Sequence, residues 1–260
     1  MKTALALSLL LFTSSALAAI VGKDVSYKAG ETTMKGYLAY DDAAKGRRAG
    51  VLVVPEWWGA NDYAKKRARM LASEGYVALV VDMYGDGQIA DNPKDAGALA
   101  GNVNRNPGLA YARFDAARKY LDRQPNVKKG ETAALGYCFG GGVVLNMARS
   151  GMPLKSAVSY HGVLATDIAV KPGAIKTKLR IFHGEADPIV PPEQVEAFKT
   201  EMDNAKADYM FVAYPGVKHT FTNREADSYA AQFNLPLKYD NAADNDSWTR
   251  TLEFLKATLK

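Results

Sequence analysis

Short apolar runs alternate with amphipathic segments along most of the chain. The run GVLVVP at residues 50–55 is typical of a strand buried on both faces, whereas apolar residues at helical spacing indicate helices. We expect strands at residues 24–29, 32–40, 50–55, 76–82, 132–137, 157–160, 179–184 and 208–214. We expect helices at residues 60–74, 109–121, 139–149, 192–206 and 247–259, the last capped by Asp246. The alternation after residue 50 predicts an α/β fold with a mostly parallel sheet and helices on both faces.

Two segments depart from this alternation. Residues 24–40 have strand character on both sides of Gly30, which predicts an N-terminal hairpin. Residues 83–107 are rich in Gly and Pro and form a candidate lid or substrate loop, part of which could be helical. There are no repeats, linkers or low-complexity segments, so we expect one domain over residues 19–260.

The first 18 residues have the pattern of a secretory signal peptide. Lys2 precedes an apolar run at residues 4–12, and Ala16 and Ala18 are small residues at the positions that a signal peptidase reads. The run is too short for a membrane span, which needs about 20 residues. We therefore expect cleavage after Ala18, a periplasmic or secreted protein, and no membrane association after cleavage.

Composition narrows the possible functions. The net charge of +5 is mild, and no basic block with interleaved aromatic residues is present, so nucleic-acid binding is not expected. The sequence has no zinc-type ligand spacing and no dinucleotide or P-loop motif, so we expect no metal and no cofactor. One cysteine cannot form an intrachain disulfide; in an oxidising compartment it is buried and inert, a dimer bridge, or reactive. Our working expectation is a monomer.

That single cysteine, Cys138, lies in the motif G-x-C-x-G at a predicted strand-to-helix junction. Gly136 and Gly140 flank it two residues away on either side, as in the nucleophile elbow in which serine is the commoner nucleophile. At a helix N-terminus the helix dipole favours a thiolate, and the N–H of Phe139 is free to donate to an oxyanion. The alternative is a structural cysteine buried in a glycine-rich turn.

A thiol nucleophile needs a base, and the chain has three histidines. In this fold the order along the chain is nucleophile, acid, histidine, and His219 alone follows both Cys138 and a strand-end acid, Asp187. Glu185 is the alternative acid. We expect His161 and His183 to be structural, His161 as a partly buried residue with its hydrogen bonds satisfied.

Glu56 follows the predicted strand at residues 50–55, at the strand end where α/β sheets bind ligands. A surface carboxylate is the alternative. The N–H of the next residue, Trp57, lies where this fold draws its second oxyanion donor. Trp58 could line the pocket or pack in the core.

Together these segments resemble the dienelactone hydrolase family of cysteine-dependent α/β-hydrolases. The matching stretches are VLVVPEWWG, GYVALVVDMYGDG, GYCFGGG, FHGEADPIVP and YPGVKHTFTN, in that order from residue 51 to residue 223. The resemblance implies an α/β-hydrolase fold and a triad of Cys138, Asp187 and His219. It also implies that Glu56 contacts the resting thiol and helps to deprotonate it when substrate binds.

The chain departs from the family at two positions. Members specific for dienelactone use arginines to hold the substrate carboxylate, but here Tyr84 is followed by Gly85 and Asp86, and Asn223 lies four residues after the histidine. The anionic lactone pocket is therefore in doubt. Trp58, Tyr84 and Arg224 are the candidate substrate contacts.

We accordingly expect a hydrolase that cleaves a small ester or lactone through a thioester intermediate. Two alternatives remain open at this stage. One is a small-molecule binding protein that keeps the fold without catalysis, and the other is a thiol redox sensor. Loss of ester hydrolysis on removal of Cys138 would separate the enzyme from both.

Overall fold

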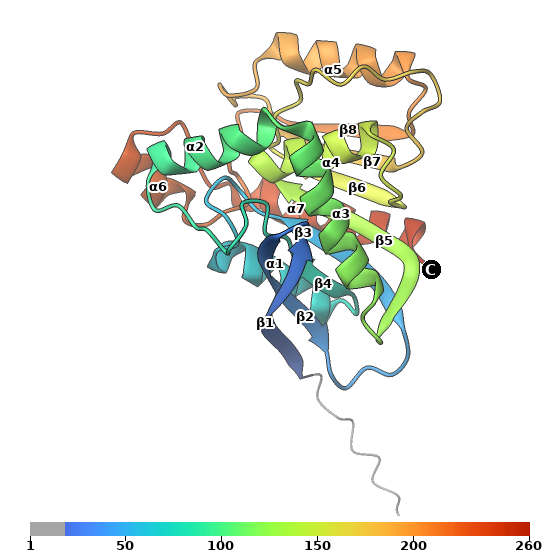
Figure 1. Cartoon of the computed structure of the whole chain (residues 1–260). Coiled ribbons are helices and arrows are strands. Elements are labelled where there is room, and N and C mark those ends of the chain that lie inside the picture. The colour runs from blue at the N-terminus through green and yellow to red at the C-terminus, as the bar shows by residue number, and fades with distance from the viewer. Residues whose placement is uncertain (1–18) are drawn as a thin grey trace, which may run out of the picture.

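The structure is a computed structural model that describes residues 19–260 (Figure 1). The expected signal peptide lies outside the described residues. The strands are β1 (Ile20–Ala29), β2 (Thr32–Asp41), β3 (Arg48–Val54), β4 (Val77–Val80), β5 (Val127–Tyr137), β6 (Ser156–Tyr160), β7 (Lys178–Gly184) and β8 (Tyr209–Tyr214). The helices are α1 (Asp62–Ser73), α2 (Pro93–Asn104), α3 (Pro107–Asp122), α4 (Phe139–Arg149), α5 (Pro192–Asn204), α6 (Ala226–Phe233) and α7 (Asn241–Thr258).

All eight strands form one sheet in the order β1-β2-β4-β3-β5-β6-β7-β8. The predicted hairpin is present: β1 and β2 pair antiparallel, and β2 runs antiparallel to β4. From β4 to β8 every pairing is parallel. The carboxyl ends of β3, β5, β6, β7 and β8 therefore meet at one edge of the sheet, where this class of fold binds its ligands.

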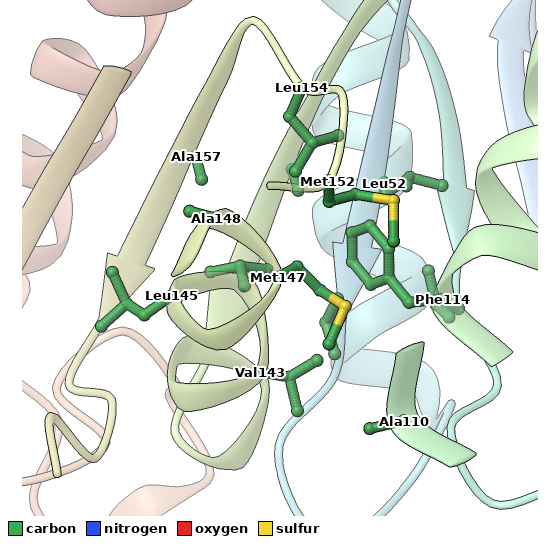
Figure 2. Packing of buried hydrophobic residues seen from close by; sticks show 14 of the residues in the cluster. Leu52, Ala110, Phe114, Val143, Leu145, Met147, Ala148, Met152, Leu154 and Ala157 are labelled. Carbon is green, nitrogen blue, oxygen red and sulfur yellow. The ribbon is translucent and has the colours of Figure 1, made fainter. Parts of the chain in front are cut away.

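The two faces of the sheet carry separate apolar cores. Alternate residues of β3 point to opposite faces: Leu52 packs with the core that includes α3, α4 and α5, and Val51 with the core that includes α1 and α7. On the first face, Met147 of α4 and Met152 extend toward the ring of Phe114 from α3 (Figure 2). This double coverage explains why the central strands read as continuous apolar runs.

Helix α7 begins earlier than its hydrophobic pattern predicts. Asp240, and not Asp246, is the N-cap, and its side chain accepts a hydrogen bond from the N–H of Ala243 at 2.9 Å. The first turns bury small or polar residues such as Ser247, so apolar periodicity does not reveal them. The predicted cap at Asp246 is therefore wrong.

Two helices lie in segments to which the hydrophobic pattern assigns no definite helix. Helix α2 occupies half of the expected lid segment, with Asn92 as N-cap and Pro93 in its first turn. Two glycines within it, Gly97 and Gly101, weaken its sequence signal. Helix α6 is only 8 residues long. Figure 1 shows α2 and α6 at the same end of the molecule. None of the helices within residues 19–260 is long and apolar enough to cross a membrane.

Candidate active site

Cys138 occupies the sharp turn between β5 and α4. Its φ of 52° is a conformation that residues with a side chain rarely adopt. A Cβ on Gly136 would collide with the carbonyl of Gly140, and a Cβ on Gly140 with the carbonyl of Val54. The flanking glycines are therefore required by close backbone contact, and the turn holds Cys138 at the N-terminus of α4.

His161, at the end of β6, supports the backbone of Cys138. The N–H of Cys138 is shared between the carbonyl of Tyr160, at 3.0 Å, and Nδ1 of His161, at 3.1 Å. Because Nδ1 accepts, Nε2 carries the proton and donates to Oγ1 of Thr222 at 2.8 Å. His161 is completely buried and not partly buried as expected. Burial, reinforced by the positive charge of His219, lowers its pKa well below the ordinary value, so the ring is neutral.

Asp187 and His219 come from the loops after β7 and β8. Nδ1 of His219 lies 2.6 Å from Oδ2 of Asp187, and both side chains are almost completely buried. The second oxygen, Oδ1, accepts the N–H of Ile189 at 2.8 Å. Glu185, the alternative acid, is exposed. Asp187 is thus the acid that orients the ring.

The protonation of His219 depends on its anionic neighbours. Burial alone would lower its pKa, but the Cys138 thiolate and the Asp187 carboxylate raise the pKa to about 10. The imidazole therefore favours the cationic form when Cys138 is charged, which is the state required of a thiolate–imidazolium pair.

Glu56 is also buried at this edge of the sheet. Its Oε2 accepts a hydrogen bond from Nδ2 of Asn223 at 2.9 Å, and its Oε1 has no hydrogen-bond partner within residues 19–260. Burial raises the pKa of Glu56 to about 7, although Asn223 and the charge of His219 act in the opposite direction. Instead of the expected contact with the resting thiol, its observed hydrogen bond is to Asn223.

Two backbone N–H groups are available beside Cys138. Those of Trp57 and Phe139 donate no hydrogen bond to any group within the described part of the chain. The N–H of Gly140 donates to the carbonyl of Pro55 at 3.1 Å, which ties the two segments together. The arrangement can therefore accept a developing oxyanion.

The three tentative substrate contacts lie elsewhere. Trp58 is buried against Tyr229, with ring centroids 4.9 Å apart, so it packs in the core. The hydroxyl of Tyr84 donates to the carbonyl of Trp57 at 2.9 Å, and it supports the loop without lining the cavity. Arg224 lies over the ring of Tyr239. None of the three residues lines the cavity that contains Cys138.

A cavity of about 510 Å³ brings the remaining groups together. Glu56, Trp57, Cys138, Phe139 and His219 all line it. Helix α2 contributes Ala100, Val103 and Asn104, so part of the predicted lid segment forms a wall of the cavity. Its size is that of a small-molecule site.

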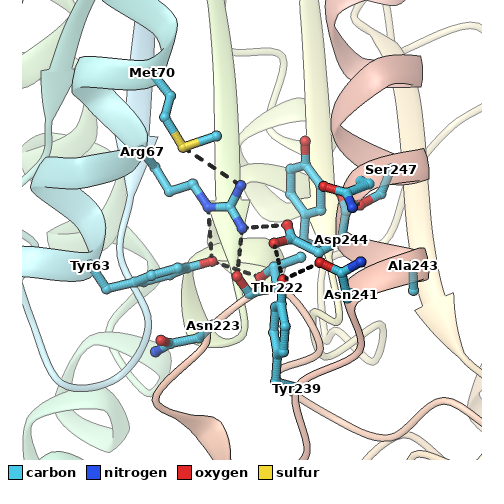
Figure 3. A network of polar contacts seen from close by, with 12 residues as sticks. Tyr63, Arg67, Met70, Thr222, Asn223, Tyr239, Asn241, Ala243, Asp244 and Ser247 are labelled. Atoms are coloured by element: carbon cyan, nitrogen blue, oxygen red, sulfur yellow. Dashed lines mark hydrogen bonds and ion pairs between the residues drawn. The ribbon is translucent and has the colours of Figure 1, made fainter.

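A buried network of polar contacts holds the loop that carries Thr222 and Asn223 (Figure 3). Arg67 of α1 donates to the carbonyl of Thr222 and forms an ion pair with Asp244 of α7. Oγ1 of Thr222 lies 2.6 Å from the hydroxyl of Tyr63. These residues, none of which was singled out from the sequence, position the partners of both Glu56 and His161.

Strained backbone is concentrated at the site. Cys138, His161 and Thr220 have positive φ values, three of the six non-glycine residues that do so within the described chain.

Within residues 19–260, no group of three or more His, Cys, Asp or Glu side chains is arranged to hold a metal ion.

Comparison with known proteins agrees with the geometry. The sequence model of the dienelactone hydrolase family matches residues 34–259. An Escherichia coli K12 protein provisionally named as a carboxymethylenebutenolidase is 29% identical and covers 92% of this chain, which spans 88% of that protein. A Bradyrhizobium protein provisionally named as a 2-oxo-3-(5-oxofuran-2-ylidene)propanoate lactonase is 26% identical, with 81% and 84% covered.

Solved structures show the same relationship. A dienelactone hydrolase-like promiscuous phosphotriesterase from metagenomic libraries is 32% identical, covers 93% of this chain and 100% of its own, and superposes with a TM-score of 0.84. The match of the family model over most of the chain establishes membership. This chain therefore belongs to the dienelactone hydrolase family and is a hydrolase with the α/β-hydrolase fold.

Proposed function

We propose that this enzyme hydrolyses a small carboxylic ester or lactone with Cys138 as the nucleophile. The observation that carries the proposal is the convergence of Cys138, the His219–Asp187 pair and two free N–H donors on one cavity. The lactonase and carboxymethylenebutenolidase names of its relatives support the substrate class.

The reaction proceeds in two acyl-transfer steps. The Cys138 thiolate attacks the carbonyl carbon, and the resulting oxyanion accepts hydrogen bonds from the N–H groups of Trp57 and Phe139, each worth about 3–4 kcal/mol in well-studied cases. The C–O bond breaks, the leaving alkoxide takes the proton of the His219 imidazolium, and a thioester remains. Neutral His219 then takes a proton from water, which attacks the thioester and releases the acid and the Cys138 thiolate.

We assign Glu56 to control of the nucleophile. Its buried carboxyl group lines the same cavity as Cys138, and Oε1 is free to accept or, when protonated, to donate toward the reacting groups. Control of the charge on the thiol would suit an exported protein, because an exposed thiolate is easily oxidised. If Glu56→Gln changed neither the turnover nor the alkylation rate of the thiol, this assignment would fail.

The primary test is hydrolysis of a panel of 4-nitrophenyl esters and simple lactones by the protein of residues 19–260. Cys138→Ala and iodoacetamide treatment should each lower the rate by about a thousandfold or more. His219→Asn should slow iodoacetamide alkylation of Cys138 near pH 7, because the thiol loses its imidazolium partner. Hydrolysis that survives both treatments would refute the cysteine mechanism. Ligand binding without hydrolysis would favour a binding protein, and peroxide reactivity alone would favour a redox sensor.

A further inference from the structure

The charge of the cavity walls bears on the kind of ester that the site accepts. Among the described residues that line the cavity, none is Lys or Arg. Two carboxyl groups line it instead: buried Glu56 close to the nucleophile, and Asp167 in the exposed segment that follows β6. The only cationic group among these lining residues is the imidazole of His219, which is already paired with Asp187. A substrate carboxylate would therefore find no unpaired cation there and would be repelled by the two carboxyl groups.

None of the described arginines close to this region lines the cavity. Arg105, the C-cap of α2, is exposed, and Arg149 of α4 pairs with Glu201. Arg113 of α3 donates to the carbonyl of Met83 at 2.7 Å and is buried outside the cavity. Arg224 lies over the ring of Tyr239, also outside the cavity. At the two positions that the family resemblance singles out, Gly85 has no side chain and Asn223 uses its amide on Glu56.

The remaining wall is mostly apolar. Val103 of α2, Met147 of α4 and Leu237 after α6 are among the side chains that form it. An unpaired carboxylate is costly to place against such a surface, whereas a hydrocarbon chain gains roughly 25 cal/mol for each Å² that it buries.

We infer that the substrate is an uncharged ester or lactone with an apolar acyl or alcohol group, and that the site rejects esters that carry a carboxylate. This inference rests on the proposed function, because it describes the substrate of the Cys138 reaction. The same charges would assist turnover: the acid released from the thioester ionises and is then repelled by the carboxyl groups of the cavity.

The test compares two esters that share the same acyl chain and leaving group and differ in one charge. They are the 4-nitrophenyl monoester of glutaric acid and the 4-nitrophenyl methyl diester of glutaric acid. Each rate is corrected for the spontaneous reaction measured without enzyme, which for the monoester includes attack by its own carboxylate. We expect kcat/KM for the uncharged diester to be at least tenfold higher at pH 7.5. Equal values, or a preference for the charged ester, would overturn the inference.

A matched pair of variants links the preference to the cavity. Val163 lines the cavity and is 37% exposed, whereas Met210 on the edge strand β8 is 44% exposed and distant from it. Val163→Arg should move the ratio of kcat/KM values at least threefold toward the charged ester, and Met210→Arg should leave it unchanged. Equal shifts in both variants would show that net charge, not the cavity, sets the ratio.

Different results would contradict the Cys138 mechanism and the inferred substrate class. Hydrolysis of both esters at equal rates, lost in Cys138→Ala, would overturn the substrate class and leave the mechanism intact. Hydrolysis of the neutral ester that persists in Cys138→Ala would overturn the mechanism itself and, with it, the inference about its substrate.

Discussion

At the level of single residues, the site combines a carboxyl group and an imidazole whose pKa values are raised for different reasons. Burial raises the pKa of Glu56 to about 7, whereas anionic neighbours raise that of His219 to about 10 against the effect of burial. When Cys138 is charged, the site can therefore hold a protonated His219 near neutral pH, together with a Glu56 that is close to half-ionised. Such displaced values are common where proton transfer takes place.

Glu56 should make folding stability depend on pH. Its pKa rises from 4.5 in the unfolded chain to about 7 in the folded protein, so between these values only the unfolded chain loses the proton. Stability contributed by this group is present below pH 4.5 and is lost as the pH rises toward 7 and above, by about 3 kcal/mol. Glu56→Gln keeps an acceptor for Asn223 and has no proton to lose.

The measurement is urea unfolding of both proteins from pH 4.5 to pH 8. As the pH rises across that range, the free energy of unfolding of the variant should increase by about 3 kcal/mol relative to that of the wild type. Glu185→Gln changes an exposed carboxylate and should follow wild type throughout. If the free energies of unfolding of Glu56→Gln and wild type changed with pH in the same way, Glu56 would not be held neutral by the fold.

At the level of elements, the strand–turn–helix unit β5–α4 determines where the nucleophile lies. Helix α4 was predicted at residues 139–149 and is observed there, because apolar periodicity and the flanking glycines act together. The elements that the sequence did not reveal, α2, α6 and the first turns of α7, are short or rich in Gly and small polar residues. Their helical state depends on capping and tertiary packing more than on periodicity.

A Cβ at Gly140 should disrupt this unit. Gly140→Ala would push against the carbonyls of Val54 and Pro55, which are backbone atoms that cannot easily move. We expect a loss of about 3 kcal/mol or more in the free energy of unfolding, together with loss of activity. Gly108→Ala in α3 is the control, because a Cβ there meets nothing within 4 Å. It should be neutral or stabilise by up to about 1 kcal/mol. If chemical denaturation showed the same loss of stability in Gly140→Ala and Gly108→Ala, close contact at Gly140 would not be the explanation.

At the level of the whole molecule, the site depends on contacts between segments far apart in the chain. Arg67 of α1, Thr222 in the loop after β8 and Asp244 of α7 meet in one buried network (Figure 3). Candidate reacting residues could be named from the sequence, since each follows a recognisable strand or turn. The network could not, because its members are ordinary helix and loop residues whose meeting follows only from the packed fold.

Breaking this network should be far more costly than breaking a surface pair on the same helix. Asp244→Asn leaves the charge of Arg67 buried without its counterion, and we expect a loss of about 3 kcal/mol in stability. Asp246→Asn removes one charge of the exposed pair with Arg250 and should cost under about 1 kcal/mol. Thermal or urea unfolding of both variants measures the difference. Losses of equal size would mean that the buried pair contributes no more than the exposed one.

The most direct test of the account is detection of the acyl group on the enzyme. The protein of residues 19–260 is mixed with a 4-nitrophenyl ester, quenched in acid within the first turnover, digested, and analysed by mass spectrometry. We predict one acyl group on the peptide that contains Cys138, removable by hydroxylamine, and absent from Cys138→Ala. An acyl group on another residue, or turnover of the ester with Cys138 never modified, would contradict the mechanism.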